Sequence, residues 1–533
     1  MANRLSRRSY SAVLLLGAWC FCGWSIALGE DVSIVVDAAK TTNVMRGGIG
    51  ASWHAIEEPI PYSDKPNHPI FKSLSHGGSA WGGYPPAEDE TAWRQIDRHA
   101  RWLGLDWNRV ELEQRIYEPE RGRFEFDNPE MRILYRILDW CQKNEADVFL
   151  QQMWANVRWN TCPEWRDDPI ARVHAGPASV DDFAGGLATL LEHLIKKKRY
   201  TCIRWLCISN EPNGWWRTYP DRALPMRPAL AAVRKALDAK GVAIPLSGPD
   251  VVACVPPLRA DMTESVPVLQ PRKFDYFDLL GAYDFHTYDE TLDWLHQQNS
   301  MAWFDKTTAD WAAWAHGQGK PLFLSEVGTM ANGWGADHPG PGSYESAFKD
   351  AELIVRRINA GADGFNRWSF INRGDLDGQW QFIETWDRKA KKLLTDYTPH
   401  ANTYFLPGLL SRFVAKHSST LSCTVNGGRM DDCQRVFAAA LRSPTGQWTL
   451  AVVNHAPVDY RMVVDVRGLK APMTLYRYGV QETDRDRADL KIHPQQAFKI
   501  ASDSPFQDRL APMSLTIYST YQLAHDAPGV MAQ

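Results

Sequence analysis

Two glutamates, Glu211 and Glu326, each follow a short apolar run that is typical of a buried strand. Glu211 stands in the segment SNEPN, between Asn210 and Pro212, and Glu326 stands in the segment LSEVG. Two carboxyl groups that face each other can cleave a glycosidic bond. One protonates the departing oxygen, and the other stabilises or captures the anomeric carbon. The residue types therefore predict a pair of catalytic carboxyl groups, provided that the fold brings them together.

The separation of two such carboxyl groups decides the stereochemistry of the reaction. At about 5–5.5 Å the second group acts as the nucleophile and the product retains its configuration. At about 6.5–9.5 Å a water molecule fits between them and the configuration is inverted.

Eight short apolar runs alternate with amphipathic stretches between residues 46 and 400. The runs begin at Gly47, Asp106, Ala146, Ile203, Ala243, Phe277, Pro321 and Asp363. Helical patterns lie between several of them, at residues 89–104, 131–144, 180–198 and 345–362. This alternation predicts parallel strands joined by right-handed crossovers, and eight units predict a (β/α)8 TIM barrel. Residues that perform chemistry in such a barrel lie at the C-terminal ends of the strands, which is where Glu211 and Glu326 stand.

The pattern changes after about residue 400. Segments such as QWTLAVVNHA and YRMVVDVRG alternate apolar and polar residues between Pro, Gly and Asn turns, which predicts an antiparallel β-sandwich. We therefore divide the chain into a signal peptide (1–29), an N-terminal strand and linker that could join the sandwich (30–45), the catalytic barrel (46–400), the sandwich (401–525) and a frayed tail (526–533).

Several of these motifs resemble one known group of enzymes. SNEP at the end of the fourth strand and LSEVG at the end of the seventh are similar to the signature of glycoside hydrolase clan A, whose members are retaining β/α-barrel enzymes. The resemblance implies that Glu211 is the acid/base, that Glu326 is the nucleophile and that Asn210 contacts a substrate 2-hydroxyl. A barrel followed by a sandwich is similar to the xylosidase-like and glucosylceramidase-like branches.

The same resemblance implies further substrate-binding residues. Trp368, at the end of the eighth strand, matches the aromatic floor of the −1 subsite. His286 and Tyr288 match a His-x-Tyr pair on the sixth strand, in which the tyrosine bonds the nucleophile. Arg109 loosely matches an arginine of the second strand that lies near the nucleophile.

Other candidates keep two interpretations. His54 could line the −1 subsite or pack in the core, and His286 could be a core histidine. Glu111 and Glu113 are rival carboxylates, of which we expect one to face the barrel interior and pair with an arginine. Loop residues at the predicted mouth could bind substrate or could pack within their loops: Trp215, Trp216, Trp334, Trp380, Arg373 and Asp375.

The composition and the N-terminal sequence limit where the protein is found and what it binds. A formal net charge of −4 with 23% charged residues argues against a nucleic-acid-binding surface. Arg4, Arg7 and Arg8 precede an apolar stretch, which predicts an export signal, and SRRSYS resembles a signal of the twin-arginine type. No later segment is long and apolar enough to insert stably in a membrane. We expect an exported protein, periplasmic or extracellular, that acts on an oligosaccharide, polysaccharide or glycoconjugate.

The cysteines and histidines indicate no zinc site, and we expect neither a metal nor a cofactor. Cys423 and Cys433 flank a turn-rich loop and could form a disulfide. Two other functions stay open, namely a metal-dependent barrel hydrolase that uses His54 and His286, and a catalytically silent glycan-binding protein. The sequence leaves open the sugar, the linkage, endo or exo action and the oligomeric state.

Overall fold

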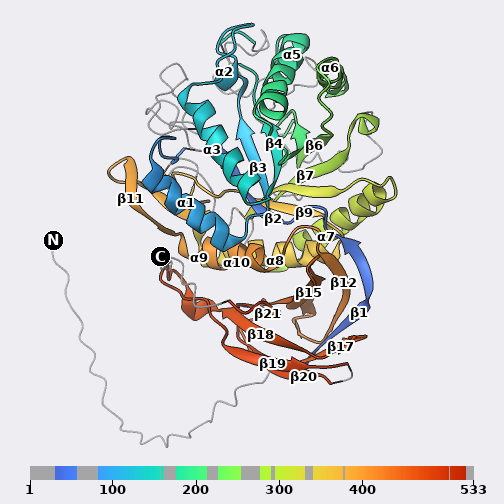
Figure 1. Cartoon of the computed structure of the whole chain (residues 1–533). Helices are drawn as coiled ribbons and strands as arrows, with labels where there is room; N and C mark the ends of the chain where they lie inside the picture. Colours follow the sequence, from blue (N-terminus) through green and yellow to red (C-terminus); the bar gives the residue numbers. More distant parts are fainter. Residues whose placement is uncertain are drawn as a thin grey trace, which may run out of the picture.

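The computed structural model describes residues 31–56, 82–156, 158–160, 176–212, 226–253, 276–289, 294–329, 340–375, 378–502 and 504–523. A barrel and a separate sheet domain make up the molecule, and they lie one above the other in Figure 1. The predicted fold class is therefore confirmed.

Eight parallel strands close the barrel in chain order, as predicted. They are β2 (Ile49–His54), β3 (Trp107–Leu112), β4 (Asp147–Gln152), β5 (Ile203–Cys207), β6 (Leu246–Ala253), β7 (Ala282–Asp289), β8 (Leu322–Thr329) and β9 (Gly364–Arg367). Only glycine fits at position 50, because a Cβ there would lie 1.5 Å from the carbonyl oxygen of Trp107 on β3. The predicted start of the sixth strand was wrong: Phe277–Leu279 form a 3-10 turn, and the Phe277 ring packs on Trp314 instead of entering the sheet.

Helices surround the barrel, and four of them lie where the amphipathic stretches at residues 89–104, 131–144, 180–198 and 345–362 predict them. The surrounding helices are α1 (Glu90–Leu103), α2 (Gln114–Tyr117), α3 (Pro129–Lys143), α5 (Val180–Leu191), α6 (Met226–Ala239), α7 (Trp294–His316) and α8 (Tyr344–Asn359). Side chains of Asp89, Asn128, Ser179 and Ser343 accept hydrogen bonds from the first-turn amides of α1, α3, α5 and α8, which satisfies donors that a helix start leaves open. The stretch predicted as one helix over 180–198 continues after Leu191 as a π-helix, Glu192–Lys197.

Aromatic side chains close the bottom of the barrel interior. Trp107, Phe149 and Phe323 pack together there with Cys207 and Ala282. Because side chains of a strand alternate between its faces, Trp107 is followed on the inner face of β3 by Arg109 and Glu111. The barrel therefore has an apolar floor and a buried polar layer above it.

The second domain is a nine-stranded sheet in the order β19-β18-β21-β16-β15-β12-β1-β17-β20. Its strands are β1 (Val32–Val44), β12 (Ser419–Asn426), β15 (Val436–Arg442), β16 (Trp448–Asn454), β17 (Tyr460–Arg467), β18 (Met473–Val480), β19 (Gln496–Ile500), β20 (Phe506–Leu510) and β21 (Ser514–Ser519). All neighbours are antiparallel except β1 and β17. Phe498 of β19 and Phe506 of β20, on the two edge strands, have ring centroids 4.6 Å apart. The sheet therefore curls around one core and resembles a sandwich.

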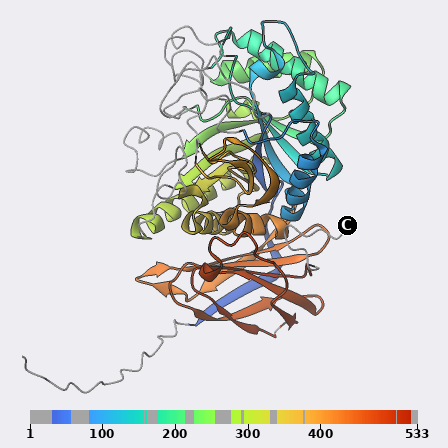
Figure 2. The same cartoon turned by 90° about the vertical axis from the view of Figure 1, so that its left-hand side faces the viewer.

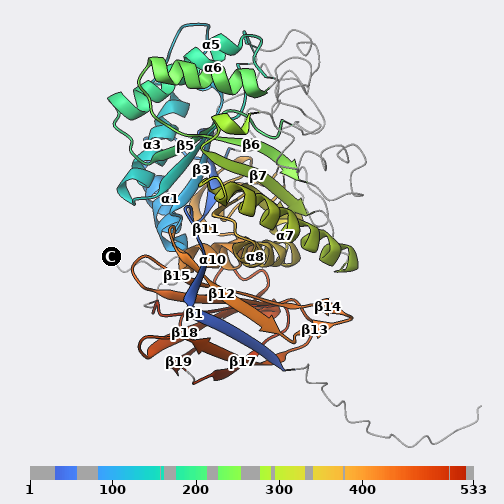
Figure 3. The ribbon, with the colours of Figure 1, turned by 90° about the vertical axis from the view of Figure 1, so that its right-hand side faces the viewer.

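The N-terminal strand β1 lies within this sheet, between β12 and β17, and the chain then enters the barrel (Figure 3). Between the two domains lie α8 and the short helices α9 (Ala401–Phe405) and α10 (Pro407–Phe413) (Figure 2). A hairpin of β10 (Ile383–Asp387) and β11 (Lys392–Pro399) packs on α1. At the junction, Glu352 of α8 accepts hydrogen bonds from His455 and from Arg356 at 2.7 Å.

The suggested Cys423–Cys433 disulfide is absent, and both residues are free thiols. Cys423 pairs in register with Val36 of β1, whereas Cys433 lies in a small ribbon formed by β13 (Arg429–Met430) and β14 (Cys433–Gln434). The two cysteines therefore belong to different strand pairs and do not meet across one hairpin. Among helices of the described residues, none combines the length and the apolar character needed to span a membrane. The predicted export signal lies outside the described residues and stays a prediction.

Candidate active site

Glu211 and Glu326 meet at one end of the barrel. Glu211 follows β5, and Glu326 lies in β8. Each contributes a carboxylate oxygen to a cluster with a ring nitrogen of His286, and these atoms all lie within 4.8 Å of one another. All three side chains are more than nine-tenths buried. The fold therefore brings together the two glutamates that the sequence singles out.

Two irregular strands aim side chains into this cluster. The register of β7 and β8 shifts between Phe285↔Leu324 and His286↔Glu326, which leaves Ser325 as the extra residue. The register of β6 and β7 shifts in the same way at Asp250, whose φ is 59°. A bulge re-aims neighbouring side chains. Glu211 also has a positive φ, 46°, a backbone conformation that is uncommon outside glycine and that gathers at functional sites.

Arg109 connects the two glutamate-bearing strands from the centre of the barrel. Its guanidinium forms ion pairs with Glu326 and with Glu111, and donates a 2.7 Å hydrogen bond to Asn210 Oδ1. Burial opposes the charge of Arg109, but the neighbouring carboxylates raise its pKa above the ordinary value. This residue therefore stays cationic and fixes the orientation of Asn210 beside Glu211.

His286 lies between Glu211 and Asp250. Its Nδ1 is 2.7 Å from Glu211 Oε1, and its Nε2 is 3.0 Å from Asp250 Oδ1. Burial alone would lower the pKa of His286, but the carboxylates of Glu326, Asp250 and Glu211 raise it well above the ordinary value. His286 is therefore an imidazolium that donates to Glu211 through Nδ1 and to Asp250 through Nε2.

Tyr288 and burial act directly on Glu326. The Tyr288 hydroxyl donates a hydrogen bond to Glu326 Oε1. Burial raises the pKa of Glu326 to about 7, against the opposite effect of His286 and Arg109. Glu326 is consequently poised to change its ionisation near neutral pH.

Trp368 and His54 form one wall beside Arg109. The two rings meet edge to face with centroids 4.9 Å apart, and the guanidinium carbon of Arg109 lies 6.0 Å from the Trp368 ring centroid. His54 Nε2 lies 2.9 Å from Glu111 Oε2. The expected pairing of a β3 glutamate with an arginine is present at Glu111, while Glu113 pairs with Arg115.

Solved structures share this architecture along nearly the whole chain. A subfamily 8 xylanase of glycoside hydrolase family 30 from Clostridium acetobutylicum has a TM-score of 0.58 and 13% identity, over 91% of this chain and 99% of that one. An α-L-arabinofuranosidase of family 51 from Thermotoga petrophila has a TM-score of 0.57 and 14% identity, over 92% and 99%. An endo-β1,6-glucanase has a TM-score of 0.57 and 11% identity, over 92% and 94%. The chain has the fold of the clan A glycoside hydrolases. No protein-family model matches its sequence, and the search of curated proteins finds no match.

Within this clan A fold, the remaining predicted residues fall into two groups. Trp215, Trp216 and Trp334 lie outside the described residues. The others are held within the protein: Trp380 packs edge to face on Tyr288, and Arg373 pairs with Asp375 while lying 4.1 Å from the Trp386 ring centroid.

Two polar residues of the clan A barrel were missed by sequence reasoning. Asp250 contacts His286, and Gln151 donates a 2.9 Å hydrogen bond to Asp250 Oδ2. The only signal for Gln151 was a polar residue at an inward position of an apolar strand. Asp250 gave no signal, because its direction depends on the bulge in β6.

Glu211, His286 and Glu326 also have the residue types of a metal site. An imidazolium, however, has no lone pair to offer a metal ion, and both ring nitrogens of His286 face carboxylates. His54 contacts a different carboxylate, that of Glu111. A second group, Cys207, Asp250 and Asp284, contains a thiol whose pKa burial raises well above the ordinary value. Both groups would therefore have to release protons to bind a metal ion.

Proposed function

We propose that this protein is a retaining glycoside hydrolase that works by double displacement. The observation that carries the proposal is that Glu211 and Glu326 meet in one buried cluster. One carboxylate oxygen of each glutamate and a ring nitrogen of His286 all lie within 4.8 Å of one another. This closeness favours direct attack by a carboxylate over attack by an intervening water. The fold shared with xylanases, arabinofuranosidases and a glucanase supports a carbohydrate substrate.

In the first step, Glu326 attacks the anomeric carbon while Glu211 gives its proton to the departing oxygen. Arg109 and Tyr288 hold the Glu326 carboxylate in place, and Asn210 presents its amide to a substrate 2-hydroxyl. In the second step, Glu211 takes a proton from water, which releases the sugar from Glu326. Trp368 and His54 form the side of the pocket at the reacting sugar.

A panel of aryl glycosides tests this function with the wild type, Glu211→Ala and Glu326→Ala. We expect azide to rescue Glu326→Ala with a glycosyl azide of inverted configuration, and to rescue Glu211→Ala with a product of retained configuration. If Glu326→Ala were as active as the wild type, Glu326 would not be the nucleophile. Sugar binding by a wild type that turns over no glycoside would favour the silent glycan-binding protein.

Export through the predicted signal peptide is part of this proposal. Detection of the mature chain outside the cytoplasm, beginning near residue 30, would support it, and a full-length cytoplasmic chain would contradict it.

A further inference from the structure

Asp250 contacts the candidate acid/base residue in two ways. Its carbonyl oxygen accepts a 3.0 Å hydrogen bond from the backbone N–H of Glu211. Its carboxylate holds His286, which in turn bonds the side chain of Glu211. Asp250 is fully buried and, like Glu211, has a positive φ. One residue therefore fixes both the backbone and the side-chain partner of Glu211.

Further contacts fix Asp250 itself. Gln151 donates to its Oδ2 at 2.9 Å, and the Ser325 hydroxyl donates to its Oδ1 at 3.4 Å. The backbone N–H of Asp250 donates a 2.7 Å hydrogen bond to Asp284 Oδ1. Since backbone and side chain are both held, the carboxylate has little freedom to leave His286.

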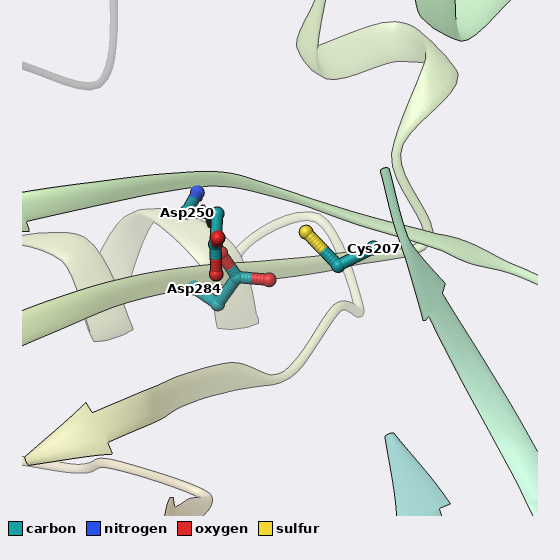
Figure 4. Close-up of side chains that lie close together, drawn as sticks. All are labelled: Cys207, Asp250 and Asp284. Carbon is teal, nitrogen blue, oxygen red and sulfur yellow. Dashed lines mark hydrogen bonds between the residues drawn. The ribbon is translucent and has the colours of Figure 1, made fainter. Parts of the chain in front are cut away.

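Figure 4 shows the carboxyl groups of Asp250 and Asp284 side by side, with the Cys207 sulfur facing them. Burial, and then repulsion from Asp250, raises the pKa of Asp284 to about 8. Asp284 is thus a neutral acid at neutral pH, hydrogen-bonded to the Ser247 hydroxyl. Of these two neighbouring aspartates, Asp250 is the one whose carboxyl group contacts His286.

Several other ionisable groups contact the partners of His286. Arg109 and Tyr288 contact Glu326, Glu111 contacts Arg109, and Cys207 and Asp284 lie beside Asp250. Arg109 opposes a second positive charge, whereas Glu326 Oε1, 3.7 Å from His286 Nδ1, favours it. Asp250 is the carboxylate that meets Nε2, on the side of the ring away from Glu211 and Glu326.

We propose that Asp250 is a positioning residue which keeps His286 as a double donor, so that His286 orients Glu211, the proton donor of the site, and stabilises the carboxylate that Glu211 becomes. This inference rests on the proposed glycosidase function. As the bond between the anomeric carbon and the leaving oxygen breaks, its electron pair goes to the oxygen, which takes the Glu211 proton. The Glu211 carboxylate so formed accepts the Nδ1–H of His286. In the second step Glu211 recovers a proton from the attacking water, and His286 keeps both protons throughout.

The direct test is NMR titration of histidine imidazole nitrogens in the full-length protein, with the His286 signals assigned by their loss in His286→Gln. We expect wild-type His286 to stay doubly protonated at pH 7. In Asp250→Asn, which keeps an acceptor but removes the charge, we expect the titration midpoint to fall by roughly one pH unit or more. Asp284→Asn is the matched control and should leave the midpoint in place. A neutral His286 at pH 7 in the wild type, or an unchanged midpoint in Asp250→Asn, overturns the inference.

A kinetic measurement separates positioning from a merely structural role. Aryl glycosides with poor leaving groups need a proton donor, whereas dinitrophenyl glycosides hardly do. We expect Asp250→Asn to lose roughly tenfold or more kcat/KM on the phenyl glycoside, much less on the dinitrophenyl glycoside, and to shift its alkaline limb to lower pH. Equal losses on both substrates would contradict the proposal. Absence of any wild-type hydrolysis refutes the glycosidase but leaves the NMR result to decide on Asp250.

Discussion

Arg109 is ion-paired with Glu326 at the centre of the barrel mouth. The same guanidinium reaches Asn210 through a second nitrogen. A planar fork of donors can serve two acceptors at once, but a lysine ammonium on a flexible stem cannot reproduce that geometry. The proposed nucleophile and the proposed 2-hydroxyl ligand therefore depend on one side chain.

Arg109→Lys should retain the fold and lose roughly a hundredfold in kcat/KM, because the contact to Asn210 or the contact to Glu326 is lost. Steady-state kinetics on the best aryl glycoside measures the loss. Arg227→Lys is a matched control, since Arg227 forms an exposed pair with Asp278 on the outside of the barrel. Equal activities of Arg109→Lys and Arg227→Lys would contradict the role of Arg109.

The pH dependence of the wild type follows from the buried state of Glu326. Its pKa is raised to about 7, so the carboxyl is protonated below that pH and cannot attack the anomeric carbon. We expect kcat/KM to rise with pH through about 7. A pH–rate profile that is already flat between pH 5 and pH 7 would show that the ionisation of Glu326 does not limit the reaction.

Tyr288→Phe removes the hydroxyl that donates to Glu326 Oε1. A hydrogen bond to a charged group contributes about 1.5–3 kcal/mol, so kcat should fall roughly ten- to a hundredfold. Tyr283→Phe, on the same strand, removes a hydroxyl that donates to Gln318 outside the barrel and should keep wild-type kcat. Similar kcat values for the two variants would argue against a direct role of Tyr288.

The junction of the domains provides a stability prediction. Burial alone would raise the pKa of Glu352, but pairing with His455 and Arg356 lowers this pKa to about 2. A lowered folded-state pKa stabilises the protein above the unfolded value near 4.3, and this contribution is lost as the pH falls toward about 2. Glu352→Gln should therefore reduce the free energy of unfolding at pH 7 by roughly 3–5 kcal/mol, and by less at pH 3.

Urea unfolding at both pH values measures this difference. Asp310→Asn breaks an exposed pair with Lys306 and should change stability by no more than about 0.5 kcal/mol. If Glu352→Gln is as stable as Asp310→Asn at pH 7, the buried network does not hold the domains together.

The sequence predicted the barrel because each inner strand is a short apolar run that stops at a polar residue. The same rule placed Glu211 and Glu326 at one mouth, since parallel strands end on the same side, and the resemblance to clan A added Tyr288. The rule failed where the direction of a side chain depends on an irregular backbone. Asp250 faces inward only because of a bulge and a positive φ, which its sequence neighbours do not reveal.

Pairing between distant strands was equally hidden from the sequence. Cys423 and Cys433 are close along the chain, but β12 pairs with β1, so Cys423 meets Val36 and the suggested disulfide does not form. The two interpretations of His286 could likewise not be separated from the sequence, because its partners lie far away along the chain: Glu211 follows β5 and Asp250 lies in β6.

The central claim is that Glu326 forms a covalent bond to the sugar, and trapping of that intermediate tests it most directly. The wild type is incubated with a 2-fluoro dinitrophenyl glycoside of the sugar that it hydrolyses best, and the labelled peptide is identified by mass spectrometry. We predict that the intact mass increases by one fluoroglycosyl group and that the label lies on Glu326. A label on another carboxylate, or release of an inverted product without any label, would contradict the account.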